Sequence, residues 1–220
     1  MGDFPRYKLV VFDLDGTLTA ERSIWEYIHV KLGKWYGYAE NYQRRFLQGE
    51  ISYHRFCELD AQVWKGMRVD ELRDIVRTVP FNPGVDELTS LMRNLGLKLT
   101  LVSSGLELLS EWVKEKYGFD YGVSNRLLHE DGILTGKVEI KVHYDRKAEW
   151  VRNIMDMFRV RSDEILAIGD SVGDREMFEM AGFSISFNSS SSELDQMADV
   201  VIKGNDLSHI IPRLPANCSP

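Results

Sequence analysis

Apolar and polar residues alternate in two different patterns along this chain. Short apolar runs, which predict buried strands, occupy residues 8–12, 97–102, 165–169, 183–187 and 199–202. Two longer segments, 84–96 and about 105–117, place apolar residues three and four positions apart, which predicts amphipathic helices. Strands that alternate with helices are typical of a parallel sheet covered by helices. The pattern predicts an α/β fold with a doubly wound, mostly parallel sheet.

The alternation stops after the first predicted strand. Across residues 17–81 no run resembles a strand, and apolar residues recur at helical spacing in four pieces. The residues that end or cap these pieces are, in order, Gly33, Gly49, Ser52, Asp70 and Pro80. Glycine and proline end helices, whereas serine and aspartate accept hydrogen bonds from a first turn. We expect a four-helix cap domain over 17–81, inserted into a catalytic core domain of 1–16 and 82–220.

A second interruption, residues 127–141, alternates apolar and polar side chains on both sides of Asp131-Gly132. This dipeptide readily adopts the positive φ angles of a two-residue hairpin turn. The segment is expected to form a small β-hairpin flap.

Length and composition are those of an ordinary globular protein. The 220 residues are 44% hydrophobic and 28% charged, which suits one domain with an insertion or two modest domains. A net charge of −7 without long Lys/Arg runs argues against nucleic acid or a membrane surface as partner. No apolar stretch suits a membrane span or a signal peptide, and Cys57 and Cys218 are expected to be free thiols. We expect a cytoplasmic protein.

Polar residues follow several predicted strands at their carboxyl ends. They are Asp13 and Asp15, then Ser103, Ser104 and Gly105, then Asp170 and Asp174, with Lys147 ahead of a predicted helix. Open parallel sheets bind ligands at this edge, so carboxylates, hydroxyls and one ammonium group are expected to meet there. Taken singly, each of these residues is more often a turn former, a loop residue or a solvated side chain.

These residues belong to four ordered motifs, D-L-D-G-T, V-S-S-G, Lys147 in D-R-K-A-E, and G-D-S-V-G-D. In this order and at strand ends, the chain resembles the haloacid dehalogenase superfamily, specifically its phosphoserine-phosphatase-like branch. The resemblance spans nearly the whole sequence, including the cap between the first and second motifs. It implies a Rossmann-like core and a phosphoric monoester hydrolase.

The resemblance implies catalytic roles for three residues. Asp13 would attack phosphorus and form an aspartyl-phosphate, and Asp15 would protonate the leaving alcohol. Lys147 would neutralise charge on Asp13 and on the phosphoryl group. Arg146 is the rival for this last role, and a surface ion pair with a neighbouring acid is the plain alternative for Lys147.

The resemblance also implies Mg²⁺ as cofactor, and oxygen-bearing side chains at the strand ends suit this hard cation. Asp13 and Asp170 would supply carboxylate oxygens, and Asp15 its backbone carbonyl. Asp174 would lie in the second shell and hold a water of the metal. The expected phosphate ligands are Gly16, Ser103, Ser104 and Lys147, through backbone N–H groups, a hydroxyl and an ammonium group.

Several positions depart from the family pattern. Ser104 and Gly173 stand where phosphoserine phosphatases usually carry glycine and asparagine. Asp60 occupies the cap position expected for an arginine that grips the substrate carboxylate, so phosphoserine is not expected to be the best substrate. The candidate substrate contacts of the cap are Glu21, Arg22 and Arg55. Glu21 lies one residue away from the position at which the family carries an acid.

Residues 21–64 hold 10 aromatic side chains in 44, well above the 11% of the whole chain. Among them are Trp25, Trp35, Tyr36 and Trp64. Such stripes are more often part of a core or a dimer face. The alternative is a pocket for a less polar or ring-bearing phosphate ester.

The sequence predicts Mg²⁺-dependent hydrolysis of a small phosphomonoester through an aspartyl-phosphate on Asp13. Two alternatives stay open: a phosphotransferase or phosphomutase that uses the same intermediate, and a catalytically silent phosphate-binding regulatory module. The expected partner is a small-molecule phosphate ester, and the chain is expected to be a monomer or a homodimer.

Overall fold

The computed structural model describes residues 7–215 and residue 218. Within them, seven strands form one sheet in the order β4-β3-β2-β1-β5-β6-β7, in which β3 and β4 are antiparallel and the other neighbours parallel. The strands are β1 (Leu9–Phe12), β2 (Lys98–Leu106), β3 (Tyr121–Glu130), β4 (Ile133–Glu139), β5 (Ile165–Gly169), β6 (Phe183–Phe187) and β7 (Val200–Ile202). The apolar runs predicted as strands are confirmed, and β2 continues beyond its predicted end.

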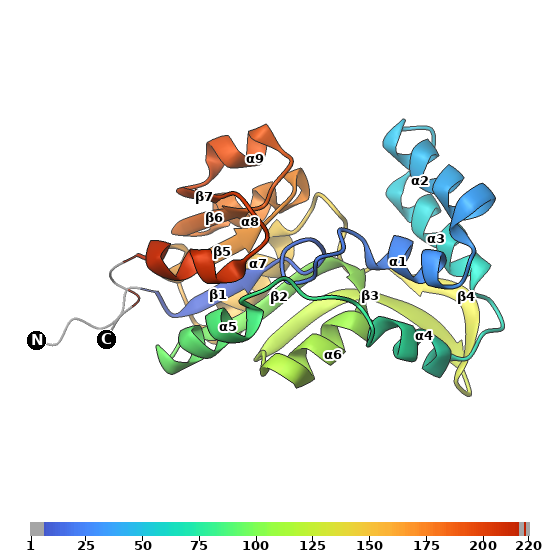
Figure 1. Cartoon of the computed structure of the whole chain (residues 1–220), viewed down its shortest axis with the longest axis horizontal. Helices are drawn as coiled ribbons and strands as arrows, with labels where there is room; N and C mark the ends of the chain where they lie inside the picture. Colours follow the sequence, from blue (N-terminus) through green and yellow to red (C-terminus); the bar gives the residue numbers. More distant parts are fainter. Residues whose placement is uncertain (1–6, 216–217, 219–220) are drawn as a thin grey trace, which may run out of the picture.

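Helices cover both faces of this sheet (Figure 1). Val10 and Phe12 of β1 belong to one apolar cluster, which they share with α5 and α6. Leu9 and Val11 belong to the other, which they share with α7, α8 and α9. These helices are α5 (Val85–Asn94), α6 (Glu107–Tyr117), α7 (Ala148–Phe158), α8 (Arg175–Met180) and α9 (Ser192–Met197). Because neighbouring residues of a strand point to opposite faces, this division makes the sheet doubly wound, as predicted.

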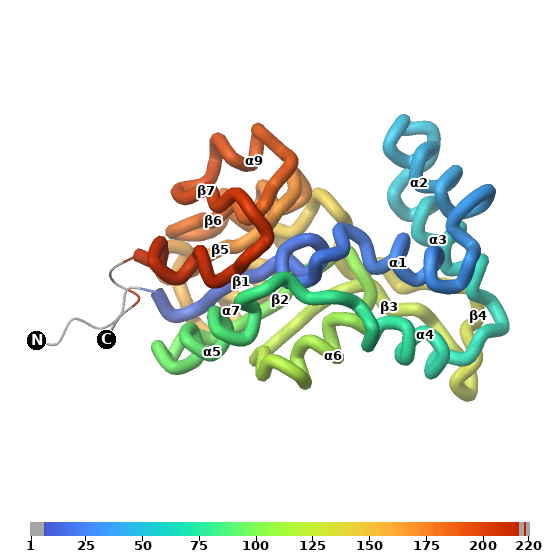
Figure 2. Tube along the Cα trace, in the orientation of Figure 1, coloured from blue at the N-terminus to red at the C-terminus, as the bar shows by residue number. Residues whose placement is uncertain are grey.

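Between β1 and α5 the chain forms a set of inserted helices. They are α1 (Ile24–Lys31), an irregular turn (Trp35–Ala39) that runs into α2 (Glu40–Leu47), α3 (Tyr53–Val63) and α4 (Val69–Val76). Figure 2 shows the chain leaving β1, passing through these helices and returning as α5 and β2. α2 and α3 stand at the β4 end of the sheet, with α3 against β4, whereas α4 lies beside α6 (Figure 1).

The helix caps confirm one prediction and correct another. The Ser52 side chain accepts a hydrogen bond from the backbone N–H of Arg55 (3.2 Å) and so caps α3. The N-cap predicted at Asp70 is wrong, because α4 already begins at Val69 and Asp70 lies in its first turn, paired with Arg73 (2.8 Å). An acid in a first turn interacts favourably with the helix dipole, so it resembles an N-cap in the sequence.

The hairpin turn at Asp131-Gly132 is confirmed, with φ angles of 49° and 78°. Its first strand, however, begins at Tyr121, well before the predicted start, and pairs in parallel with β2. Residues 123–125 are buried in succession, as in the interior of a parallel sheet, so they show no alternation. The hairpin is therefore the projecting end of the central sheet.

Short 3₁₀ turns complete the fold at Ser162–Glu164, Val172–Asp174 and Leu207–Arg213. None of the helices in the described part of the chain is long and apolar enough to cross a membrane.

Candidate active site

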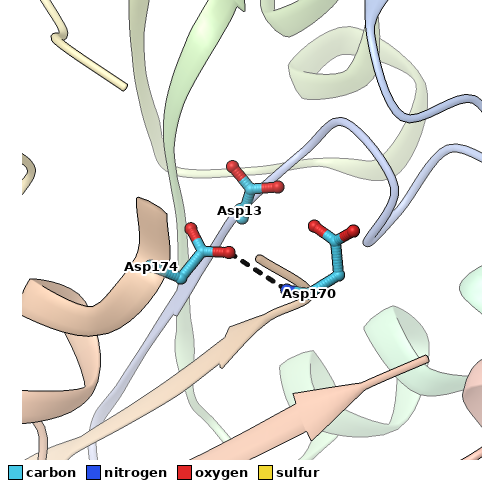
Figure 3. Close-up of side chains that lie close together, drawn as sticks. All are labelled: Asp13, Asp170 and Asp174. Carbon is cyan, nitrogen blue, oxygen red and sulfur yellow. Dashed lines mark hydrogen bonds between the residues drawn. The ribbon is translucent and has the colours of Figure 1, made fainter. Parts of the chain in front are cut away.

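Two neighbouring strands, β1 and β5, bring the predicted carboxylates together. In their parallel register Phe12 lies opposite Ile168, so Asp13 and Asp170 leave the same edge of the sheet. Figure 3 shows these two side chains with that of Asp174, which comes from the turn after β5. One oxygen of each carboxylate lies within 4.8 Å of the others, and all three residues are buried. The structure thus assembles an acid cluster, made of Asp13, Asp170 and Asp174, at the predicted edge.

Lys147 immediately precedes α7, and its side chain is buried against the acid cluster. Its Nζ atom donates hydrogen bonds of 2.6 Å to Asp13 Oδ1 and to Asp174 Oδ1. Burial lowers the pKa of Lys147, but the two acids outweigh it and raise this pKa above its usual range. The rival Arg146 has a side chain 77% exposed and pairs with Asp145. The plain alternative of a surface ion pair for Lys147 is therefore wrong.

Both oxygens of Asp174 already have hydrogen-bond partners. Oδ1 accepts from Lys147, and Oδ2 accepts the backbone N–H groups of Asp170 and Ser171, each at 3.0 Å. The dashed line in Figure 3 marks the bond to Asp170. Gly169 leaves room for this arrangement, because a Cβ atom there would lie 2.6 Å from the Asp174 carboxylate. Asp174 therefore positions both the Asp170 loop and the Lys147 head group.

The acid cluster holds more negative than positive groups. Burial and repulsion from Asp174 raise the pKa of Asp13 to about 7, against the lowering effect of Lys147. Burial and repulsion from both neighbouring acids raise the pKa of Asp170 to about 8. Carboxyl groups with such raised pKa values lack enough positive charge around their ionised forms. Their oxygens are the ligands that hard divalent cations take in proteins.

Arg22 brings a second cationic side chain to the acid cluster. Its guanidinium, on a side chain 50% exposed, donates to Asp170 Oδ2 (2.9 Å) and to the carbonyl of Asn188 (2.8 Å). The sequence predicted Arg22 as a substrate contact of the cap, and nothing in the sequence pattern indicated either partner. Both partners follow strands of the core that lie far from Arg22 in the sequence.

Asp15 lies on the loop after β1 with its own set of partners. Its Oδ1 accepts the backbone N–H of Ile24 (2.8 Å), and its Oδ2 accepts the hydroxyl of Ser103 (3.3 Å). Burial raises the pKa of Asp15 to about 6, against the lowering effect of these hydrogen bonds. A Cβ atom at Gly105 would collide with Asp15 Oδ2, so this position requires glycine. The second motif thus packs directly on Asp15.

In the loop after Asp15, Gly16 differs from its predicted role and Thr17 is a site residue that was not predicted. Gly16 has a φ of +85°, and a Cβ atom there would collide with Asp170 Oδ2. Its backbone N–H donates to the carbonyl of Glu21 (2.7 Å), so this predicted phosphate donor is already used within the loop. Thr17 was not predicted as a site residue although it ends the first motif. It is buried, and its hydroxyl lies 3.4 Å from Asp13 Oδ2.

Two of the other cap residues predicted to matter for the substrate, Asp60 and Arg55, lie away from the site, whereas Glu21 reaches it through its backbone carbonyl, which accepts the N–H of Gly16. Asp60 is buried among the inserted helices, with Oδ1 3.2 Å from Nε2 of His29. Arg55 is exposed and pairs with Glu58 (3.1 Å). Neither they nor Glu21 line the cavity next to the acid cluster. The expectation that Asp60 takes the place of a substrate-binding arginine is therefore wrong, because this side chain faces the interior of the inserted helices.

A cavity of about 160 Å³ opens beside Asp15 and is lined also by Ser104, Gly105 and Arg22. The aromatic residues that line it are Trp25, Phe46, Tyr53, Phe56 and Tyr144. We call it the aromatic cavity. A larger cavity, of about 210 Å³ between α4 and α6, is lined by none of the predicted site residues. A third cavity, of about 530 Å³, is lined by Arg55 and residues of β4 but not by Asp15 or the acid cluster. Of these three cavities in the described part of the chain, the aromatic cavity is the one that Asp15 lines.

Comparison with known proteins places this geometry in a family. Residues 10–179 match the haloacid dehalogenase-like hydrolases. A phosphoserine phosphatase of Archaeoglobus fulgidus is 31% identical over 215 residues, which cover 95% of this chain and 61% of that longer protein. A phosphoserine phosphatase of Methanocaldococcus jannaschii is 27% identical over 208 residues, which cover 93% of this chain and 96% of that protein.

A solved structure agrees with the sequence relatives. It is described as a phospho-aspartyl intermediate analogue of phosphoserine phosphatase, and it is 26% identical with a TM-score of 0.82. The alignment covers 96% of this chain and 100% of that one. The chain therefore belongs to the haloacid dehalogenase-like hydrolases, as a phosphoric monoester hydrolase of the phosphoserine-phosphatase-like branch.

Proposed function

We propose that this chain hydrolyses a small phosphomonoester with Mg²⁺ as cofactor, through a phosphorylated Asp13. One observation carries the proposal: Asp13, at the end of a buried strand, has one carboxylate oxygen held by Lys147 and lies next to Asp170. The similar solved structure, described as an analogue of a phospho-aspartyl intermediate, supports the same chemistry.

Asp13 is the proposed nucleophile. Its Oδ1 atom is bonded to Lys147 at 2.6 Å, whereas its Oδ2 atom has only the longer contact of 3.4 Å to Thr17. Oδ2 is therefore the freer oxygen to attack phosphorus. A bond forms between this oxygen and phosphorus while the bond to the leaving oxygen breaks. Water then hydrolyses the aspartyl-phosphate, which releases phosphate and restores the carboxylate.

Asp15 is the proposed acid and base. Its pKa of about 6 is higher than that of an exposed aspartate, so a larger fraction of it carries a proton near neutral pH than an exposed aspartate would. In the first step it gives its proton to the leaving alkoxide. In the second it accepts a proton from the attacking water. The bond from the backbone N–H of Ile24 (2.8 Å) holds the carboxyl group in place for both transfers.

Mg²⁺ fits the residues that are present. The raised pKa values of Asp13 and Asp170 mark two buried carboxylates whose charge lacks a positive partner. These two side chains would hold the ion, together with the backbone carbonyl of Asp15. Asp174 suits an outer position, because Lys147 and two backbone N–H groups use both of its oxygens. When bound, the ion would supply positive charge that reduces the repulsion between the carboxylate nucleophile and the phosphate.

Ser103 and Lys147 are the proposed phosphate ligands. The Ser103 hydroxyl oxygen accepts the backbone N–H of Gly105 (2.9 Å), which orients it at the edge of the sheet. Its hydrogen is directed at Asp15 Oδ2 (3.3 Å), so it has to turn from Asp15 to a phosphate oxygen when the substrate binds. The Lys147 ammonium offers a third donor beyond the two that the acids use, so it can also neutralise charge on the phosphoryl group.

The test uses nitrophenyl phosphate as a general substrate. Hydrolysis by the purified full chain should require Mg²⁺ and be lost with EDTA. Asp13→Asn should lower kcat by at least about 10³-fold, because the amide keeps the shape but is not a nucleophile. Asp145→Asn, at a partly exposed acid near Lys147, is the matched control and should keep normal activity. Retained activity in Asp13→Asn, with deamidation excluded by mass spectrometry, would remove Asp13 from the mechanism.

A further inference from the structure

The aromatic cavity begins where the leaving group of a bound ester would be. Asp15, the proposed proton donor to the leaving oxygen, lines it together with Ser104 and Gly105. The rest of the lining comes from the inserted helices and the loop before α7. Whatever is attached to the leaving oxygen must extend from Asp15 into this space. The walls of the cavity therefore select the leaving group.

The polar atoms of the aromatic walls are bonded to the protein itself. The Tyr53 hydroxyl donates to the carbonyl of Ser104 (2.9 Å) and accepts from Nδ2 of Asn125 (3.0 Å). Nε1 of Trp25 donates to the same carbonyl at 3.4 Å. With these groups engaged, the two side chains present ring carbon atoms to the cavity. A ligand with many hydrogen-bonding groups would find few partners there.

The rings also brace one another. Phe46 stacks on Phe56 with centroids 5.2 Å apart and meets Tyr144 edge to face at 5.1 Å. Tyr53 contacts Tyr144 at 5.4 Å. Phe46 is only partly buried, in contrast with Trp64, which is fully buried behind Trp25. The aromatic residues of this segment therefore divide into a packed core and a wall that is open to a ligand.

The aromatic cavity has few charged side chains, and each of them has a role or partner outside the ligand's own charges. Among the described residues that line it, the charged ones are Asp15 and Arg22. Asp15 is needed at the leaving oxygen, and Arg22 donates to Asp170 and to the carbonyl of Asn188. A zwitterionic leaving group, such as serine, needs an acid and a base for its own charges. Burying it without them would be costly.

The volume of the cavity matches a single ring. It measures about 160 Å³. An apolar protein cavity of about 150 Å³ accommodates benzene. A flat ring can place its faces and edges against the wall rings at the distances that aromatic pairs prefer.

We propose, resting on the hydrolysis proposed above, that the preferred leaving group is a neutral alcohol that carries one planar ring. Phe46 lies at the centre of the wall and acts as a specificity-determining residue. Asp15 protonates the alkoxide, and the ring occupies the aromatic cavity.

The experiment compares esters whose leaving alcohols have similar acidity. Phenethyl phosphate and ethyl phosphate differ by the ring, so the ratio of their kcat/KM values reports its binding. Phosphoserine is the zwitterionic competitor. The wild-type chain should prefer phenethyl phosphate over each of the others by at least about tenfold. Equal values for phenethyl and ethyl phosphate, or a preference for phosphoserine, would overturn the proposal.

Substitutions at Phe46 test whether this residue causes the preference for the ring-bearing ester. Phe46→Ala should lower the ratio of phenethyl to ethyl phosphate by about tenfold. Tyr38→Ala removes an aromatic ring of the same segment that is 63% exposed and does not line the cavity, so it should leave the ratio unchanged. Phe46→Leu keeps most of the side-chain volume and should shift the ratio in the same direction even where the alanine variant does not fold. A ratio that stays at the wild-type value in a folded Phe46 variant would contradict the assignment.

Acetyl phosphate separates the two proposals, because its good leaving group needs neither an acid nor a cavity. If wild type hydrolyses acetyl phosphate and shows no preference for the ring, the inference about the leaving group alone is wrong. If it does not hydrolyse acetyl phosphate with Mg²⁺, the proposed function is wrong and this inference falls with it.

Discussion

The acid cluster and the aromatic cavity meet at Asp15, yet they are built from opposite kinds of contact. In the acid cluster, charged groups hold one another at hydrogen-bond distance, as Lys147 does with Asp13 at 2.6 Å. In the aromatic cavity, the contacts are between ring faces and edges, as between Phe46 and Phe56, whose centroids lie 5.2 Å apart. The first arrangement depends on direction and charge. The second depends on area and shape.

Because of this difference, we expect the acid cluster to set the rate of hydrolysis and the aromatic cavity to set the preference among esters. A group that touches the phosphoryl centre acts on every ester, because that centre is common to all of them. A group that touches only the leaving alcohol acts on some esters and not on others. Substitutions in the acid cluster should therefore lower kcat for all esters alike. Substitutions in the cavity should change the ratio between esters, and residues shared by both regions test where the boundary lies.

After Asp13→Asn, the largest effect is expected for Lys147→Met, which removes the lysine that donates to Asp13 and Asp174. kcat should fall by about 10²- to 10³-fold, to the same extent for ethyl and nitrophenyl phosphate, because the lost charge faces the phosphoryl group. Lys137→Met, at an exposed lysine of β4, is the matched control. Unequal losses on the two esters would place Lys147 on the leaving-group side. Urea unfolding should accompany the assay, since Asp13 and Asp174 lose a buried partner.

The next effect is selective by leaving group. Asp15→Asn removes the proposed proton donor, so hydrolysis of ethyl phosphate should fall by about 10²-fold or more. Nitrophenyl phosphate, whose leaving group needs little protonation, should lose far less. Parallel kcat/KM measurements on both esters give the answer. Equal losses would assign Asp15 to phosphate or metal binding instead.

Arg22 belongs to both regions, and its removal should act through the metal. Its guanidinium occupies Asp170 Oδ2, the acid proposed to bind Mg²⁺, and so competes with the ion. The side chain is half exposed, so the pair is weak. Arg22→Gln should lower the Mg²⁺ concentration for half-maximal activity by roughly two- to fivefold. Arg146→Gln is the exposed control, and an increased Mg²⁺ requirement in Arg22→Gln would refute this competition.

The smallest effect on catalysis is expected at Asp60, which lies in neither region. Burial raises the pKa of Asp60 above its usual value of 3.8, so the native state keeps this proton at pH values where the unfolded state has lost it. The resulting stability is fully present below 3.8 and is lost as pH rises through the native pKa. Asp60→Asn removes this dependence while activity stays near wild type.

Urea unfolding across acidic to neutral pH checks this last expectation. The free energy of unfolding of wild type should fall relative to that of Asp60→Asn as pH rises. Asp74→Asn, at a side chain 78% exposed, should follow wild type. Curves for wild type and Asp60→Asn that stay parallel would show that Asp60 titrates alike in the native and unfolded states.

The sheet and the acid cluster were predictable for one physical reason. Parallel strands place their carboxyl ends on one edge, so residues just after each strand converge without further information. Asp13 and Asp170 meet as this rule requires. Lys147 follows no strand and joins them from the residue before α7. Thr17 was overlooked because a threonine after a glycine is also an ordinary loop residue. The partners of Arg22 could not be predicted, because they depend on the path of two loops.

The inserted helices were less predictable, because helical spacing shows which residues share a face but not what that face meets. In α3 the spacing of Phe56, Leu59 and Val63 predicts one apolar face, whereas the buried residues include Phe56, Cys57 and Asp60. The buried face of α3 was hard to predict because it carries Asp60, a charged residue type. The partner of Asp60 is His29 on α1, and the spacing within α3 does not indicate this partner. Because Asp60 pairs with His29, it does not contact a substrate in the aromatic cavity.

The pairing of β1 with β5, which are far apart in the sequence, also determines at which stage of folding activity appears. The contacts that complete the acid cluster join distant parts of the chain: Thr17 and Asp170 are 153 positions apart, and Lys147 and Asp13 are 134 apart. Closing such long loops costs entropy before the contacts can stabilise the chain, so contacts of this kind form late. The stacked pair Trp25 and Trp64 lies within the inserted helices and needs no such closure. Recovery of hydrolysis after dilution from denaturant should therefore lag behind recovery of tryptophan fluorescence from this pair.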